Sequence, residues 1–107
     1  MSSMIHSEIQ KLSEMISYQD GTIVSKTLIN KDMGTVTLFA FDKDQSLSEH
    51  TAPFDALLQV FDGEVDVVIS DNKYHLKTGE MILMPANVPH AVMATEKFKM
   101  MLIMIKS

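Results

Sequence analysis

Apolar and polar positions follow a helical period at the start of the chain. Ser7 and Gln10 form an S-x-x-Q capping box, which is the signature of a helix N-terminus. The apolar residues around and after this box recur at the spacing of one helix face: Ile9, Leu12, Met15 and Ile16. The pattern predicts a short α-helix that ends near residues 19–21, so that residues 1–21 form an N-terminal helical arm.

From residue 22 onward the pattern changes to short β-branched and aromatic runs separated by Gly, Asn, Asp and Pro. This texture is typical of many short strands rather than of alternating strands and helices. Asp71-Asn72 is the expected turn of a hairpin. The expected strands cover residues 22–29, 35–41, 56–61, 64–70, 73–77, 81–84, 90–94 and 98–106. We therefore predict an all-β body over residues 22–107, within a single domain over residues 1–107.

The last expected strand is apolar on both faces, because residues 100–105 contain no polar side chain. One face should enter the core. The other face must meet a second layer, either the N-terminal helix or another subunit. A second subunit is the more economical explanation, so we predict a homodimer formed through the C-terminal strand and the N-terminal segment.

Composition and charge limit the classes of partner that the protein can bind. The chain has 107 residues, no cysteine and a formal net charge of −5, which argues against nucleic acid because phosphate binding needs a basic face. All nine basic residues are lysines, so no arginine fork is present for a multiply anionic ligand. No apolar run is long enough to span a bilayer and no signal-peptide pattern is seen. We expect a cytoplasmic protein without a membrane partner.

The most informative motif runs from Gly79 to His90. Its order is Gly, five residues, Pro85, then a turn with Asn87 in place of the usual glycine, and finally the histidine. This spacing resembles the second motif of the cupin superfamily, and Gly63 ends a stretch that resembles the first. The resemblance covers about residues 35–105 and implies an antiparallel jelly-roll barrel of two sheets with a pocket at one mouth. Asparagine suits the turn because it adopts positive φ readily.

A narrower resemblance is to small single-domain bacterial cupins. It is carried by residues 46–56 together with the closing residues 98–100, Phe-Lys-Met. This likeness sharpens the expected fold and leaves the activity open, because one fold hosts many functions.

The first motif departs from the family pattern of His, any residue, His, three or four residues, Glu, six residues and Gly. Counting back from the final glycine, His50 is present, whereas Ala52 and Ala56 stand at the second histidine and the glutamate. The resemblance therefore implies only His50 and His90 as metal ligands, two of the usual four. A complete centre of three histidines and one carboxylate is excluded.

Two interpretations of this histidine pair stay open. Two imidazoles with water can hold a divalent ion such as Zn, Ni, Fe or Mn weakly, and Asp55, Glu49 or Gln59 is a candidate to complete the shell. Asp55 is one position away from the inward face, since side chains alternate along a strand. Alternatively, His50 and His90 are metal-free pocket residues that hydrogen-bond each other, water or a ligand.

The other histidines carry no predicted function. His75 should point outward, opposite to Tyr74 and Leu76 on the same strand, and His6 precedes the helix cap near the terminus. The sequence has no G-x-S-x-G turn and no glycine-rich phosphate loop, so hydrolase and nucleotide-binding functions lack support.

Three hypotheses on function follow, and whether the protein is an enzyme stays open. The first is a binding module whose barrel pocket accepts a small, weakly polar ligand without a complete metal site. The predicted lining residues are His50, Ala52, Phe54, Ala56 and His90. The alternative is a metal-dependent cupin enzyme of isomerase or dioxygenase type with a reduced His50/His90 centre. The third is a scaffold in which the dimer surface matters more than the pocket.

Overall fold

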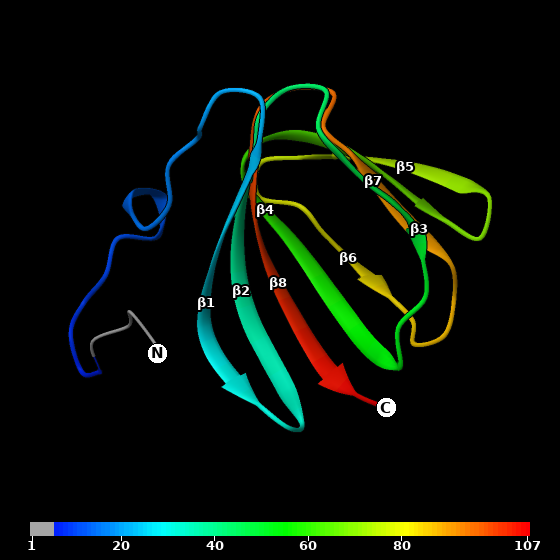
Figure 1. Cartoon of the computed structure of the whole chain (residues 1–107), viewed down its shortest axis with the longest axis horizontal. Helices are drawn as coiled ribbons and strands as arrows, with labels where there is room; N and C mark the ends of the chain where they lie inside the picture. The colour runs from blue at the N-terminus through cyan, green and yellow to red at the C-terminus, as the bar shows by residue number, and fades with distance from the viewer. Residues whose placement is uncertain (1–5) are drawn as a thin grey trace.

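The computed structural model describes residues 6–107, which form a curled antiparallel jelly roll (Figure 1). Its strands are β1 (Ile23–Lys31), β2 (Gly34–Phe41), β3 (Ser46–His50), β4 (Phe54–Ile69), β5 (Asn72–Lys77), β6 (Met81–Met84), β7 (His90–Met93) and β8 (Phe98–Lys106). The first sheet has the order β1-β2-β8-β4-β6, and the second sheet has the order β5-β4-β7-β3. The predicted all-β antiparallel fold is confirmed.

Strand β4 joins the two sheets because its first half pairs with β8 and β6 and its second half with β5 and β7. The register shifts between Val60 and Asp62, where the strand passes from one sheet to the other. Gly63 follows with φ of 80°, and a Cβ atom there would lie 1.9 Å from the carbonyl oxygen of Lys97. Only glycine fits this crossing without a backbone shift.

Most predicted strands are confirmed, with three corrections. Residues 56–61 and 64–70 belong to one strand, because Asp62 and Gly63 pair with β8 after a bulge at Phe61 and do not form a turn. Strand β3 was not predicted, because its sequence Ser-Leu-Ser-Glu-His is mostly polar and shows no sustained alternation of apolar and polar residues. The hairpin turn lies one residue earlier than expected: Ser70 and Asp71 have positive φ, while Asn72 pairs with Ile69.

The core fills the space between the two sheets. Every second residue of β4 is buried, first Ala56, Leu58 and Val60, and after the bulge Val65 and Val67. The change from even to odd positions occurs because the bulge adds one residue. The remaining buried members of this cluster are Phe41, Leu76, Met84, Val92, Ala94, Phe98 and Met100. Burial of this apolar surface stabilises the barrel and fixes which side chains of each strand face inward.

The predicted N-terminal helix is wrong. Within the described part of the arm only a 3-10 turn, Leu12–Glu14, is formed, and the expected cap residue Ser7 has φ of 65°. Ile9 is fully exposed, so it is not part of an apolar helix face. A short helix has a large nucleation cost, and contacts with the barrel replace it here. No helix among residues 6–107 is long and apolar enough to cross a membrane.

The arm instead lies on the outer face of the first sheet, beside β1 in Figure 1. Ile16 is buried there against Leu38 and Ala40 of β2. Lysines of the sheet satisfy carbonyl groups of the arm: Lys99 Nζ donates to Ser13 O over 3.0 Å, and Lys26 Nζ to Met15 O over 3.4 Å. Apolar packing and side-chain hydrogen bonds thus hold the arm without a helix.

Tyr18 is the polar anchor of the arm. Its hydroxyl donates to Asp62 Oδ2 over 2.5 Å, and the ammonium groups of Lys97 and Lys99 lie 5.6 Å and 5.1 Å from the ring centroid. Burial raises the pKa of Tyr18, and the hydrogen bond to Asp62 raises it further. The protonated tyrosine therefore keeps the arm attached beside the bulge of β4.

Beyond the arm, the outer face of the first sheet carries an apolar row that crosses five strands. Register partners link its members from strand to strand. The apolar row consists of Ile29, Val36, Ile103, Leu57 and Leu83. Ile29 and Leu83 at its two ends are 49% and 57% exposed. The second apolar face of β8 is thus covered by the arm at Met101 and left open farther along.

Candidate functional site at the rim of the barrel

His50 and His90 lie against each other at the rim of the barrel. His50 is the last residue of β3, His90 is the first residue of β7, and the two are register partners. Their ring centroids are 4.3 Å apart with an interplanar angle of 65°, an edge-to-face contact. His90 is 8% exposed, whereas His50 is open to solvent. Two histidines 40 positions apart in the sequence therefore form one pair, as the predicted site requires.

Each ring is held by a backbone carbonyl two residues before it. His50 Nδ1 lies 2.7 Å from Ser48 O, and His90 Nδ1 lies 3.1 Å from Val88 O. A carbonyl oxygen only accepts hydrogen bonds, so in each neutral ring the proton is on Nδ1 and the lone pair is on Nε2. Neither Nε2 atom has a hydrogen-bond partner among residues 6–107.

The turn before His90 is fastened to the segment after His50. Asn87, with φ of 63°, donates its backbone N–H to Ala52 O over 2.8 Å. Ala86 N donates to Asp55 Oδ1 over 3.0 Å. On the other side, Ser70 N donates to Pro89 O over 3.0 Å. These bonds fix how the two histidines approach each other, and the positive φ explains why asparagine substitutes for glycine here.

The candidates for a third metal ligand do not join the pair. Asp55 accepts the hydrogen bond of Ala86 N, which agrees with its predicted position off the inward face. Gln59 is the register partner of Met81, which is exposed on the outer face. Within residues 6–107, no three His, Cys, Asp or Glu side chains gather closely enough to hold a metal ion. The described residues thus offer a donor set of two imidazoles, which does not fit the family's four-ligand centre.

The other predicted pocket residues lie at two depths. Ala52 and Phe54 are half-buried near the rim. Ala56 is 3% exposed and belongs to the core cluster, with its register partners Met84 and Met104 on either side. Side chains therefore fill the barrel at the level of Ala56.

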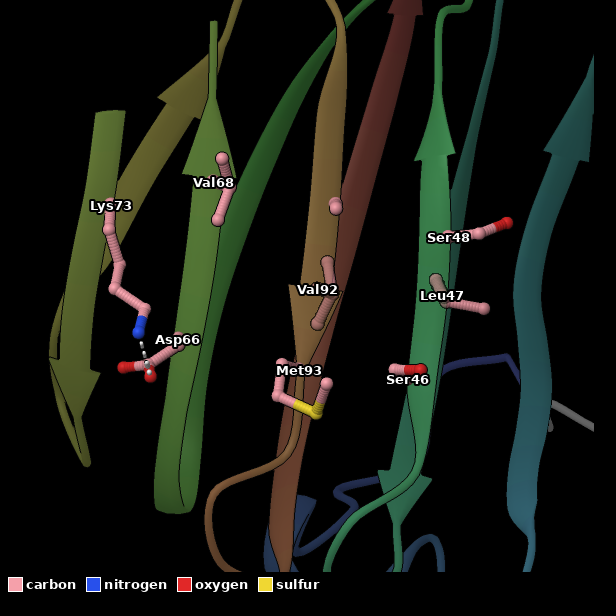
Figure 2. A pocket seen from close by; sticks show the side chains of 9 residues that line it. Ser46, Leu47, Ser48, Asp66, Val68, Lys73, Val92 and Met93 are labelled. Atoms are coloured by element: carbon pink, nitrogen blue, oxygen red, sulfur yellow. Dashed lines mark ion pairs between the residues drawn. The ribbon is translucent and has the colours of Figure 1, made fainter. Parts of the chain in front are cut away.

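Sequence reasoning missed a groove on the outer face of the second sheet. Its lining side chains come from β5, β4, β7 and β3 (Figure 2), and its volume is about 300 Å³. The lining residues are Ser46, Leu47, Ser48, Asp66, Val68, Lys73, Ala91, Val92 and Met93. The alternation of outward side chains supplies part of the signal, but the strand order that brings these residues together is set by β3, which was not predicted.

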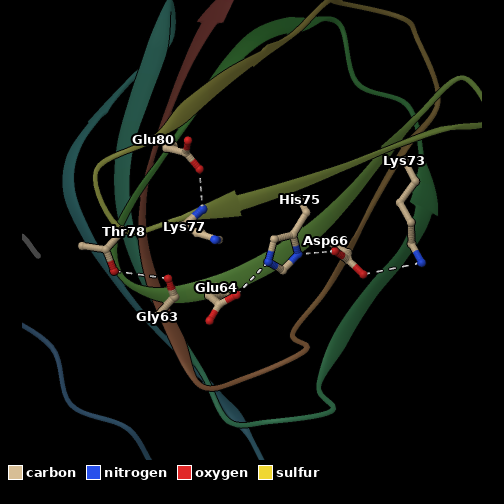
Figure 3. Close-up of polar contacts among 8 residues, drawn as sticks. All are labelled: Gly63, Glu64, Asp66, Lys73, His75, Lys77, Thr78 and Glu80. Atoms are coloured by element: carbon tan, nitrogen blue, oxygen red, sulfur yellow. Dashed lines mark hydrogen bonds and ion pairs between the residues drawn. The ribbon is translucent and has the colours of Figure 1, made fainter.

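His75 stands at the side of this groove with a very different environment. Its Nδ1 lies 2.7 Å from Asp66 Oδ1 and its Nε2 lies 2.7 Å from Glu64 Oε1 (Figure 3). Lys73 Nζ lies 3.5 Å from Asp66 Oδ2. The hydrogen bond to Asp66, followed by that to Glu64, raises the pKa of His75. The prediction that His75 points outward, opposite to the buried Leu76, is confirmed.

The two sheets, the shared strand β4 and the histidines at the rim define a small jelly-roll barrel. A family model described as Cupin domain matches residues 37–106, and the chain belongs to the cupin family. No curated protein matches the chain.

Solved structures agree with this assignment. A conserved protein of unknown function from Streptococcus pyogenes has a TM-score of 0.93 and 30% identity, covering 97% of this chain and 91% of that chain. A cupin superfamily protein from Desulfitobacterium hafniense has a TM-score of 0.90 and 25% identity, with coverages of 96% and 94%. A cupin 2 conserved barrel domain protein from Leptotrichia buccalis has a TM-score of 0.86 and 46% identity, covering 89% of this chain and 46% of that chain.

Proposed function

We propose that the protein binds a small, weakly polar molecule at the rim of its barrel, beside His50 and His90. The observation that carries this proposal is the pair of imidazoles 4.3 Å apart, each anchored through Nδ1 with its Nε2 free of protein hydrogen bonds. A few converging polar groups beside apolar surface are the usual form of a small-molecule site.

The exposure of each rim residue determines the contact that we propose for it. His90 is nearly buried and fixed by the turn before it, so it provides a rigid polar contact. His50 is exposed and meets the ligand from the solvent side. Ala52 and Phe54 offer apolar surface beside the rings, and the methyl group at Ala52 leaves room that a histidine would fill.

A fragment screen by NMR tests this proposal. Small uncharged compounds are added to the labelled protein, and we expect the hits to shift the signals of His50, Ala52, Phe54 and His90 together. The His50→Ala variant should lose at least tenfold in affinity for the same hits, whereas His75→Ala, on the outer face, should retain it. Hits that shift only the signals of the groove on the second sheet would reject the rim as the binding site.

A metal-dependent enzyme is the second candidate, favoured by the two free Nε2 atoms. His50 and His90 would hold the ion, which would act as a Lewis acid. Two protein ligands bind a divalent ion weakly, so we derive no reaction through it. Elemental analysis of untagged protein for Zn, Ni, Fe and Mn decides: near-stoichiometric metal that both His50→Ala and His90→Ala lose would favour the enzyme.

We also propose that the protein forms a homodimer through the apolar row. The row crosses five strands without a charged residue, and a two-fold axis would place it against its own copy. We expect a homodimer in analytical ultracentrifugation and a monomer for Leu83→Glu. Met93→Glu, an exposed apolar position on the second sheet, is the matched control and should stay dimeric. A wild-type monomer at high concentration would refute the proposal.

A further inference from the structure

We infer that the rim site selects a neutral hydrogen-bond donor, a small alcohol in chemical class, over ligands that only accept hydrogen bonds. This inference rests on the proposed function and adds the polarity of the ligand to it. It follows from the bonds that the two rings have already made. Ser48 O and Val88 O each take one ring N–H, so both remaining ring nitrogens are acceptors when the imidazoles are neutral.

Three backbone donors of the segments around the rim are also engaged within the protein. Ala86 N donates to Asp55, Asn87 N donates to Ala52 O, and Ser70 N donates to Pro89 O. These three N–H groups thus hold the loops of the rim together. The two Nε2 atoms offer acceptor capacity to a ligand, so a hydroxyl group that donates can bond to them and a group that only accepts faces their lone pairs.

One cation lies on a neighbouring strand end. Lys106 is exposed and is the register partner of Phe54 at the end of β8. An ammonium group could attract a carboxylate to this side of the rim, although exposed charges in water attract weakly. A lone pair on each free Nε2 atom disfavours that anion, so the rim favours the neutral donor.

The first experiment measures the tautomers directly. Long-range ¹H–¹⁵N NMR of the imidazoles, at a pH where the same spectrum reports neutral rings, should give a protonated Nδ1 and an unprotonated Nε2 for both His50 and His90. His75 provides an internal comparison, because its two nitrogens both face carboxylates. A proton on Nε2 of both rim histidines would overturn the inference without any ligand.

The second experiment compares cyclohexanol with cyclohexanone, which share a ring and differ in the ability to donate. We expect the alcohol to bind at least tenfold more tightly, and the His50→Ala variant to reduce this preference below about threefold. Equal binding of both probes at the rim would overturn the donor preference and leave the binding proposal intact. Tighter binding of cyclohexanecarboxylate would also overturn it. Failure of all three probes to bind would count against the proposed function itself.

Discussion

The rim pair and His75 place the same side chain in opposite situations. At the rim, each imidazole makes one hydrogen bond to a backbone carbonyl and keeps one nitrogen unbonded. On the outer face, both ring nitrogens of His75 are hydrogen-bonded, to Asp66 and Glu64. A ring with both nitrogens engaged has no capacity for a ligand, whereas a ring anchored on one side can present the other.

This difference distinguishes the rim histidines from His75 better than exposure does. His50 and His75 are both open to solvent, yet only His50 retains an unused acceptor. His90 is nearly buried and retains one too. Three predictions test the contrast, beginning with the largest expected effect.

His90→Ala should destabilise the fold much more than His75→Ala. The first change removes a buried ring, its bond to Val88 and its contact with His50, and we expect a loss of about 2 kcal/mol in the free energy of unfolding. The second removes exposed contacts and should leave that free energy nearly unchanged near neutral pH. Urea denaturation of both variants measures the difference. Equal losses would show that the rim ring is no more integral to the fold than the outer one.

Asp55→Ala should weaken the rim without touching either histidine. It deletes the acceptor of Ala86 N, and we expect a loss of about 1 kcal/mol in stability and severalfold weaker binding at the rim. Asp55→Asn keeps an oxygen acceptor and is the matched control, with both quantities close to the wild type. If the two variants behave alike, Asp55 does not position the turn before His90.

The smallest effect is a pH dependence that belongs to His75. Its pKa is raised by Asp66 and then Glu64, so its stabilising contribution is complete below the unfolded imidazole pKa of about 6.5 and is lost as pH rises through the higher folded value. His75→Gln should therefore cost more stability at about pH 6 than at about pH 9. Added salt should shrink the gap. A variant that differs from wild type equally at both pH values would contradict this assignment.

Much of the fold could be predicted because strand signals are local. The hairpin of β4 and β5 follows from alternating residues and a short turn. The failures involve positions where a tertiary contact decides. Leu12 and Met15 have helical spacing, yet their burial against the first sheet replaces the helix. Asp62 and Gly63 are residue types typical of turns, yet they pair within β4 directly after its bulge, because the strand passes from one sheet to the other.

The proximity of the two candidate histidines could be predicted from the sequence, because the motif spacing identifies both residues. His50 and His90 were expected together from motif spacing, and the structure pairs them. The bond from Ala86 to Asp55 was hidden, because it joins two loops through a side chain that points away from the pocket. The outer groove was hidden too, since its residues meet only through the strand order.

Gly63, the last residue of the first cupin motif, is required by the fold itself. The close approach of Lys97 O forbids any side chain there, whatever the barrel binds. Ala52 is under no such steric demand because it is half-buried near the rim, whereas Ala56 is packed in the core. The motif therefore contains a steric requirement of the fold at Gly63 that holds whether or not the family's metal ligands precede it. A partial match identifies ancestry and shape, while activity must be established residue by residue.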